Sequence, residues 1–308
     1  MKILVIGAGA MGSIYGGHLS LHNEVYIVDK NSSLLNQISN NGLKINEEGQ
    51  DNIYKPTAIA CTKDIGTVDL VILFVKSLFS RTALEENKNV IDENTYILTL
   101  QNGAGHEDLI EEFVPKDRII IGTTEDNGAI LDLGYVKRGG VGNTNLGMLV
   151  EDKQNMLPKC KEAFDICGFN CRIYSNIKQL VWDKLFTNVS LSAVTGILLV
   201  PIGYVAANEY AWNMAKQLIH EAITVASALN LQFDEEEIVE RVKQTSQKSP
   251  EGLTSIYMDL KHARKTEVNT ISGSVVSAAK KVSVPVPTHE FVVNFIHAME
   301  EKNQINNI

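Results

Sequence analysis

Residues 2–12 read KILVIGAGAMG and combine two patterns. Residues 2–7 form a mostly apolar run that ends in glycine, which predicts a buried strand of a parallel sheet. Residues 7–12 fit the pattern G-x-G-x-x-G and lead into a helical stretch from about residue 10 to residue 21. A glycine turn between a strand and a helix is typical of a βαβ unit that binds a dinucleotide.

The residues of this turn are the predicted cofactor-binding residues: Gly7, Gly9, Ala10, Met11 and Gly12. We expect Gly7 to permit the tight turn, Gly9 to let the backbone approach a pyrophosphate, and Gly12 to let the helix pack closely on the strand. Backbone N–H groups and the positive end of the helix dipole would then hold the phosphates. A P-loop is excluded because the Lys-Ser/Thr pair that it requires is missing.

Residues 24–28 predict a second strand, after which come Asp29 and Lys30. A carboxylate at this position accepts a hydrogen bond from the 2′-hydroxyl of NAD and repels the 2′-phosphate of NADP, whereas a cation favours NADP. Because the sequence offers both groups side by side, the choice of cofactor stays open here. The alternative is that Asp29 caps the next helix and that Lys30 is solvated.

Strands and helices alternate through the first half of the chain. Further strands are expected at residues 53–60, 68–75, 96–100 and 118–122, and helices at 32–40 and 79–90. Short antiparallel strands are expected across 126–148, then a helix at 151–167 and a last strand at 170–174. After Ser175 helical periodicity dominates, with candidate helices at 176–196, 207–229, 234–246, 252–281 and 288–301.

This order predicts an α/β protein with two domains. Residues 1–172 would form an N-terminal Rossmann-type, doubly wound parallel sheet that binds the dinucleotide. Residues 173–308 would form a C-terminal all-helical domain that carries the substrate and catalytic groups.

Polar residues follow two of the predicted buried strands. Lys76 comes directly after the strand at 68–75, and Gln101, Asn102 and Gly103 close the next one. Ligands of an open α/β sheet bind beyond the carboxyl ends of its strands, so Lys76 and Asn102 are placed to meet the cofactor. Gly103 would allow a close turn around a ring. The competing interpretations are a solvated Lys76 and an Asn102 that only forms a turn.

The helical half holds two clusters of polar residues. Lys184 and Asn188 are four residues apart, so they share one face of an otherwise apolar predicted helix, and Lys184 is suited to proton transfer there. The second cluster extends from Ser255 to Glu267 on the predicted helix 252–281. The competing explanation for the first cluster is that Lys184 lies along the apolar surface with its ammonium group in water, and for the second cluster it is a solvated helix face.

Composition excludes several classes of protein. Lys and Arg number 28 and Asp and Glu 37, for a formal net charge of −9, so neither a nucleic-acid partner nor an anionic membrane is expected. No apolar run is long enough to span a bilayer, and no secretory pattern is present. The cysteines are irregularly spaced, which predicts buried free thiols in the cytoplasm and no metal site.

Taken in order, these motifs resemble the ketopantoate reductases (2-dehydropantoate 2-reductases). The motifs are GAGAMG, a Val-Lys pair after the fourth strand, Gln-Asn-Gly, Trp-x-Lys-Leu-x-x-Asn, and Ser-x-x-x-Asp followed by Arg-x-Thr-Glu-Val and Gly273. The resemblance implies reduction of the ketone of 2-dehydropantoate to (R)-pantoate with a nicotinamide cofactor, usually NADPH, on the route to pantothenate and coenzyme A. It also implies an active site in the cleft between a Rossmann domain and a helical domain.

The resemblance assigns roles to individual residues. Lys184 matches the family's catalytic lysine and Glu267 its active-site glutamate, which also lies near the cofactor. Asn102, Asn188 and Ser255 match residues that contact the substrate, a small anionic keto acid. The resemblance leaves the oligomeric state open, with a homodimer as one option.

Two positions depart from the family pattern. Many members carry a second Asn four residues beyond Asn188, where this chain has Ser192. A shorter hydroxyl would bond to the substrate through water. The family's NADP-binding arginine aligns with Lys30, which lacks the bidentate fork, and Asp29 would oppose the phosphate. NADP(H) therefore follows from the family and NAD(H) from Asp29. The alternatives are a dehydrogenase for another small keto or hydroxy acid and a non-catalytic dinucleotide-binding regulator.

Overall fold

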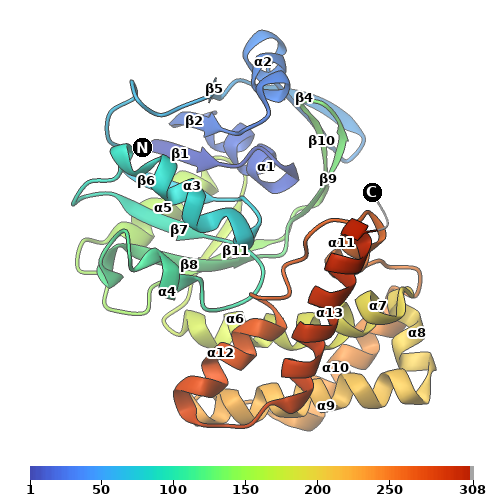
Figure 1. Ribbon diagram of the computed structural model, residues 1–308. Helices are drawn as coiled ribbons and strands as arrows, with labels where there is room; N and C mark the ends of the chain where they lie inside the picture. The colour runs from blue at the N-terminus through green and yellow to red at the C-terminus, as the bar shows by residue number, and fades with distance from the viewer. Residues whose placement is uncertain (306–308) are drawn as a thin grey trace. The chain divides into compact units, whose positions relative to one another are not determined.

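A computed structural model describes residues 1–305 (Figure 1). They form two compact units, the first made of Met1–Gln101 and His106–Lys178, the second of Asn102–Gly105 and the chain from Gln179 onward. The predicted boundary at 172/173 therefore lies a few residues too early. Tyr174 N donates to Leu146 O at 2.8 Å and Ile177 packs on Gly147, so residues 174–178 stay with the first unit.

The main sheet of the first unit has eight strands in the order β12-β11-β8-β7-β6-β1-β2-β5 (Figure 1). Their bounds are β1 (Lys2–Ile6), β2 (Glu24–Val28), β5 (Thr57–Ile59), β6 (Leu70–Leu73), β7 (Tyr96–Thr99), β8 (Ile119–Thr124), β11 (Asn143–Gly147) and β12 (Asn170–Ile173). The six neighbouring strands β8, β7, β6, β1, β2 and β5 run parallel to one another. Strand β11 pairs antiparallel with β8. The chain leaves β1 toward β2 on one side and β6 lies on the other, which creates a switch point where such sheets bind ligands.

A second sheet of four strands has the order β4-β3-β10-β9. Its strands are β3 (Leu43–Glu47), β4 (Gln50–Tyr54), β9 (Asn127–Asp132) and β10 (Tyr135–Gly140). The expectation of one strand over 53–60 is wrong, because β4 and β5 are separate and belong to different sheets. Pro56, which has no N–H to donate, lies between them. Glu48 and Gly49 turn β3 back into β4 with φ angles of 50° and 88°.

Helix α1 (Ala10–Leu19) lies between the two sheets, as Figure 1 shows. A side chain at Gly16 would collide with Ile27 of the main sheet, and one at Gly17 with Ile45 of the second sheet. Both faces of α1 are therefore buried, and the helix lacks the polar face of a surface helix. The remaining helices of this unit are α2 (Ser32–Asn41), α3 (Ser80–Glu86), α4 (His106–Ile110) and α5 (Met156–Asp165).

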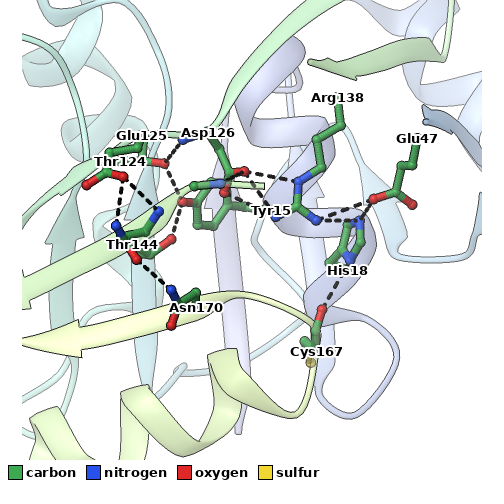
Figure 2. Close-up of polar contacts among 12 residues, drawn as sticks. Tyr15, His18, Glu47, Thr124, Glu125, Asp126, Arg138, Thr144, Cys167 and Asn170 are labelled. Carbon is green, nitrogen blue, oxygen red and sulfur yellow. Dashed lines mark hydrogen bonds and ion pairs between the residues drawn. The ribbon is translucent and has the colours of Figure 1, made fainter. Parts of the chain in front are cut away.

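A buried cluster of charges fixes the second sheet to α1 (Figure 2). The guanidinium group of Arg138 on β10 donates to Asp126 at 3.1 and 3.2 Å and to Glu47 at 3.3 Å. His18 on α1 contacts Glu47 at 2.8 Å and the carbonyl oxygen of Cys167 at 3.1 Å. Burial lowers the pKa of His18 despite the neighbouring Glu47 carboxylate, which raises it. None of the sequence-based expectations included this arrangement.

The second unit is helical, coloured yellow to red in Figure 1. Its elements are α6 (Ile177–Thr187), a turn of π-helix η4 (Asn188–Ser192), α7 (Ala193–Leu198), α8 (Ile202–Ala207), α9 (Glu209–Ala228), α10 (Glu235–Lys248), α11 (Ser255–Lys261), α12 (Ser272–Val282) and α13 (Pro287–Ile305). Apolar side chains from these helices form one buried core around α9.

The predicted helix over 252–281 is wrong, because α11 and α12 are separated by residues 262–271. Helix α11 ends where Ala263 adopts a left-handed φ of 52° and Arg264 N donates back to Asp259 O at 2.8 Å. Such a left-handed residue is the usual end of a helix, although glycine normally occupies it. Glu267 therefore lies on a connecting turn and not on a helix.

Candidate functional site

A cavity of about 670 Å³ opens in the first unit where β1, β2 and β6 end. Its volume lies within the range of small-molecule and cofactor sites. The lining residues that follow these strands are Ile6, Gly7, Gly9, Val28, Asp29, Lys30, Phe74, Val75 and Lys76. The predicted cofactor-binding residues Gly7, Gly9, Asp29, Lys30 and Lys76 therefore line the same cavity.

The three glycines of the turn do different things. Gly7 has a φ of +100°, and a Cβ there would lie 2.9 Å from Val75 N. A Cβ on Gly12 would lie 1.9 Å from Gly7 O, so Gly12 allows α1 to start against the turn. Gly9 has nothing within 4 Å of its Cβ position. Of the three glycines, Gly9 is therefore the one with open space at its Cβ position.

This open side fits a phosphate group. Gly9 is the N-cap of α1 and supplies no side-chain hydrogen bond to the first turn, which begins with Ala10 and Met11. An uncapped helix start directs N–H groups and the positive end of the dipole outward. The residues present therefore fit the pyrophosphate of a dinucleotide.

Asp29 is fixed to the glycine turn. Its carboxylate accepts from Ala8 N at 2.7 Å and from Asn31 N at 2.9 Å. Asn31, and not Asp29, caps α2 by accepting from Leu34 N at 3.1 Å. The interpretation of Asp29 as a helix cap is therefore wrong, and its carboxylate is held at the cavity wall.

Lys30 forms an ion pair with Glu86 of α3, with 2.5 Å between Nζ and Oε2. The lysine side chain is 81% exposed and the carboxylate 43%. Lys30 is therefore largely solvated, as the alternative interpretation expected, but it is also paired with Glu86, which competes with any phosphate for it.

Helix α3 forms the cavity wall that the sequence did not predict. Helix α3, the residues that flank it and the two residues after β5 contribute Ala60, Cys61, Phe79, Thr82, Ala83, Glu86 and Asn87. Phe79, Thr82 and Glu86 are spaced by three and four residues, so a helical face was visible in the sequence. Cys61 is exposed, which contradicts the expectation that all four thiols are buried.

Gln101 joins the ends of β6 and β7. Its side-chain amide donates to Val75 O at 2.6 Å and to Ser80 Oγ at 2.8 Å. This contact fixes the backbone immediately before Lys76.

In the second unit, Lys184 and Asn188 lie where α6 changes into the π-helical turn. Lys184 is half-buried in the last turn of α6. Asn188 begins the π-helical turn and Ser192 ends it, with Ser192 only 5% exposed. Single π-helical turns inside helices occur frequently at functional sites.

Ser255 lies near α7 because the preceding residue, Thr254, contacts that helix. Thr254 caps α11 by accepting from Tyr257 N at 3.3 Å, and its hydroxyl lies 2.7 Å from the hydroxyl of Thr195 on α7. Helix α11 also packs against η4. The exposed Ser255 at the start of α11 is therefore close in the fold to the helix that follows Ser192.

Asn102 and Glu267 belong to adjoining segments of the second unit. Ala104 N donates to Thr270 O at 3.0 Å, and Thr270 N donates to Glu267 O at 3.1 Å. A Cβ on Gly103 would lie 2.0 Å from Thr270 O, at a φ of +99°. The missing side chain of Gly103 thus makes room for the Thr270 backbone.

Within residues 1–305, no group of three or more His, Cys, Asp or Glu side chains is arranged to hold a metal ion. No helix in that range is long and apolar enough to cross a membrane.

Comparison with known proteins identifies the family. A sequence model of the family "Ketopantoate reductase PanE/ApbA" matches residues 3–151, and its C-terminal counterpart matches residues 176–300. A 2-dehydropantoate 2-reductase from Lactococcus lactis subsp. lactis is 32% identical over 98% of each chain. One from Pyrococcus horikoshii is 29% identical over 97% of this chain and 98% of its own.

Among solved structures, D-mandelate dehydrogenase in a ternary complex with NADH and anilino(oxo)acetate is also similar. It is 30% identical, covers 99% of both chains and superposes with a TM-score of 0.90. These matches span both units. The chain therefore belongs to the ketopantoate reductase family of oxidoreductases.

Proposed function

We propose that this protein reduces 2-dehydropantoate to (R)-pantoate by hydride transfer from a nicotinamide cofactor, in pantothenate and coenzyme A biosynthesis. The observation that carries the proposal is the contact between the segment of Asn102 and the turn of Glu267, described above. Asn102 and Glu267 are far apart in the sequence, and the resemblance matches both to active-site residues of the family. The fold places them on adjoining segments. The family match over both units supports the reaction type.

For the cofactor we propose binding at the cavity of the first unit, with NADH preferred. Asp29 is held at the wall by Ala8 N, so its carboxylate can accept from a ribose 2′-hydroxyl and would repel a 2′-phosphate. Lys30 is already paired with Glu86, which weakens the cation that a 2′-phosphate needs. The similar D-mandelate dehydrogenase was solved with NADH, which agrees with this preference.

For the chemistry we propose that Lys184 acts on the substrate carbonyl oxygen. A nicotinamide cofactor, when bound, would supply the hydride for the ketone carbon, and negative charge would develop on that oxygen. A protonated Lys184 would stabilise the charge and then donate its proton to give the hydroxyl group. The products are the 2-hydroxy acid and the oxidised cofactor.

The other residues of the second unit would bind the substrate. We propose that Glu267 accepts from a substrate hydroxyl, and that Ser255 with nearby amides holds the carboxylate. Asn102, Asn188 and Ser192 would contact the rest of the molecule. Ser192 is buried, at 5% exposure, and would contact the substrate directly or through one water.

A second candidate is reduction of an aryl 2-keto acid. It is favoured by the similarity to D-mandelate dehydrogenase and by Ser192, which is shorter than the Asn that many family members carry. A smaller side chain leaves more room for a ring in the substrate pocket.

The test is a steady-state assay of two substrates with two cofactors. Ketopantoate and phenylglyoxylate are each reduced with NADH and with NADPH, and kcat/KM is compared across the four pairs. We expect the highest value for ketopantoate with NADH. A higher value for phenylglyoxylate would select the second candidate, and no turnover of either acid would refute both. Chiral chromatography of the product establishes its configuration.

A further inference from the structure

We propose that Glu300 on α13 is a positioning residue for Glu267, acting through Thr266. This inference rests on the proposed function, because it concerns the glutamate that we assign to the substrate site.

The contact between Glu300 and Thr266 is direct and buried. Glu300 Oε1 accepts from Thr266 N and from Thr266 Oγ1, both at 2.7 Å. The carboxylate side chain is only 2% exposed. A buried carboxylate with two donors from one residue holds that residue closely, because both bonds are charge-assisted.

The hydroxyl of Thr266 continues the contact across Glu267. Thr266 Oγ1 donates to Glu300 and accepts from Val268 N at 3.2 Å. The residues on both sides of Glu267 are therefore bonded to one hydroxyl, and that hydroxyl is bonded to Glu300. Any displacement of Thr266 would therefore move the backbone of Glu267 and with it the Glu267 side chain.

The second oxygen of Glu300 extends the contact to the rest of the turn. Glu300 Oε2 lies 3.0 Å from His297 Nδ1 and 3.6 Å from Lys265 Nζ. The other ring nitrogen of His297 lies 3.0 Å from Asn269 Oδ1. Helix α13 thus contacts the turn before and after Glu267.

The turn depends on such contacts because neither neighbouring helix contains it. Helix α11 ends at Lys261 and α12 begins at Ser272, which leaves Glu267 on irregular backbone. Loop residues are usually more mobile than helical ones unless side chains hold them. Glu300 supplies that hold from a 19-residue helix.

A matched control contacts the same helix, α13, at its other end. Glu221 of α9 is also buried, at 5% exposure, and its carboxylate accepts from Thr288 Oγ1 at 2.5 Å and His289 N at 3.2 Å. It therefore caps the start of α13, whereas Glu300 lies near the end of that helix. Loss of Glu221 should destabilise α13 without loosening the Glu267 turn.

The experiment compares Glu300→Ala, Glu300→Gln, Thr266→Val and Glu221→Ala with the unchanged protein. Two properties are measured: kcat and KM for the keto acid, and hydrogen exchange of the amides of residues 266–271. We expect Glu300→Ala and Thr266→Val to lower kcat about 10- to 100-fold, as for a misplaced catalytic group, and to speed exchange in this turn. The affinity for NADH should not change.

Glu300→Gln should retain most activity, because its carbonyl oxygen can still accept from Thr266. Glu221→Ala should lower the melting temperature but leave kcat and exchange at 266–271 unchanged. The inference is overturned if Glu300→Ala keeps kcat within twofold, or if Glu221→Ala lowers kcat equally. Hydrogen exchange needs no substrate, so an inactive protein would refute the proposed function and still allow the contact to be tested.

Discussion

Arg138 and Asp126 form a buried ion pair in which the guanidinium group contacts both carboxylate oxygens, at 3.1 and 3.2 Å. Their side chains are 3% and 0% exposed. Gly142 N also donates to Asp126, at 3.1 Å. The pair connects β10 with the loop after β8 and lies beside α1 (Figure 2). The N-cap of α1, Gly9, lines the cavity of the first unit.

We predict that Arg138→Met lowers the free energy of unfolding by about 3–5 kcal/mol, because Asp126 is left as a buried charge without its main partner. The double change Arg138→Met with Asp126→Leu should recover much of this loss. Urea denaturation at pH 7 measures both effects. A loss below about 1 kcal/mol for Arg138→Met would show that the pair contributes little.

Gly9→Val should abolish dinucleotide binding while the protein still folds. The added side chain meets no protein atom within 4 Å and would occupy the open side proposed for the pyrophosphate. Gly12→Ala is the contrast, since its Cβ would lie 1.9 Å from Gly7 O and should impair folding itself. Calorimetric titration with NADH, together with circular dichroism, separates the two results. Unchanged affinity in a folded Gly9→Val protein would exclude this site.

Asp29→Ala should raise the affinity for NADPH relative to NADH by about 1 kcal/mol, through loss of like-charge repulsion that solvent partly screens. Glu86→Gln should act in the same direction, because it releases Lys30 for the 2′-phosphate. Glu85→Gln, an exposed neighbour on α3 outside the cavity lining, is the control. Dissociation constants for both cofactors give the ratio, and a ratio unmoved by Asp29→Ala would place Asp29 away from the ribose.

Lys184→Ala should lower kcat for the ketone about 10²- to 10⁴-fold, the usual range for loss of a general acid. Binding of NADH should be nearly unchanged, because the cavity belongs to the first unit. Activity of the unchanged protein should also fall toward alkaline pH, as Lys184 loses its proton. Lys178→Ala, on the same helix, serves as the control. Full activity of Lys184→Ala would remove the proposed proton donor.

His289 should make the protein sensitive to mild acid. Burial lowers its pKa from 6.5 to about 4, and the neutral ring lies with Nε2 3.0 Å from Leu218 O. Between these two values the unfolded chain binds a proton that the folded protein does not, so stability falls as the pH falls from 6.5 to 4. The full shift corresponds to about 3 kcal/mol.

The variant His289→Gln tests this effect, since its amide can still donate to Leu218 O. We expect the difference in unfolding free energy between pH 7 and pH 5 to shrink by about 2 kcal/mol. His22→Gln, at an exposed position, should leave that difference as it is. An equal pH dependence in His289→Gln and the unchanged protein would assign the acid sensitivity to other groups.

The sequence predicts best those elements whose pattern is local. Strand β1, the glycine turn and α1 follow from an apolar run and three glycines, and all of them are confirmed. The strands β3 and β4 were not predicted as a pair, because the alternation in β3 is short and β4 is exposed except at Tyr54. The break before Glu267 escaped prediction since Ala263, an unusual residue for a left-handed position, marks it.

Within the candidate site, motif residues could be named from sequence but their supporting contacts could not. Lys30 and Glu86 are far apart in the chain, and so are Thr266 and Glu300. Such pairs depend on how α3 and α13 pack against the rest of the fold. The local pattern of apolar and polar residues in a single sequence does not predict that packing.

The segment Asn102–Gly105 interrupts the α/β part of the chain, yet it belongs to the helical unit. A fragment that starts at Gln179 would therefore leave out the N–H group of Ala104 that bonds to Thr270 O. A chimera that joins the first half of one relative to the second half of another would combine residues 102–105 and residues 265–271 from different proteins. Only exchanges that transfer residues 102–105 together with residues 265–271 should preserve this fit, so homologous recombination within the family is constrained at two separated places at once.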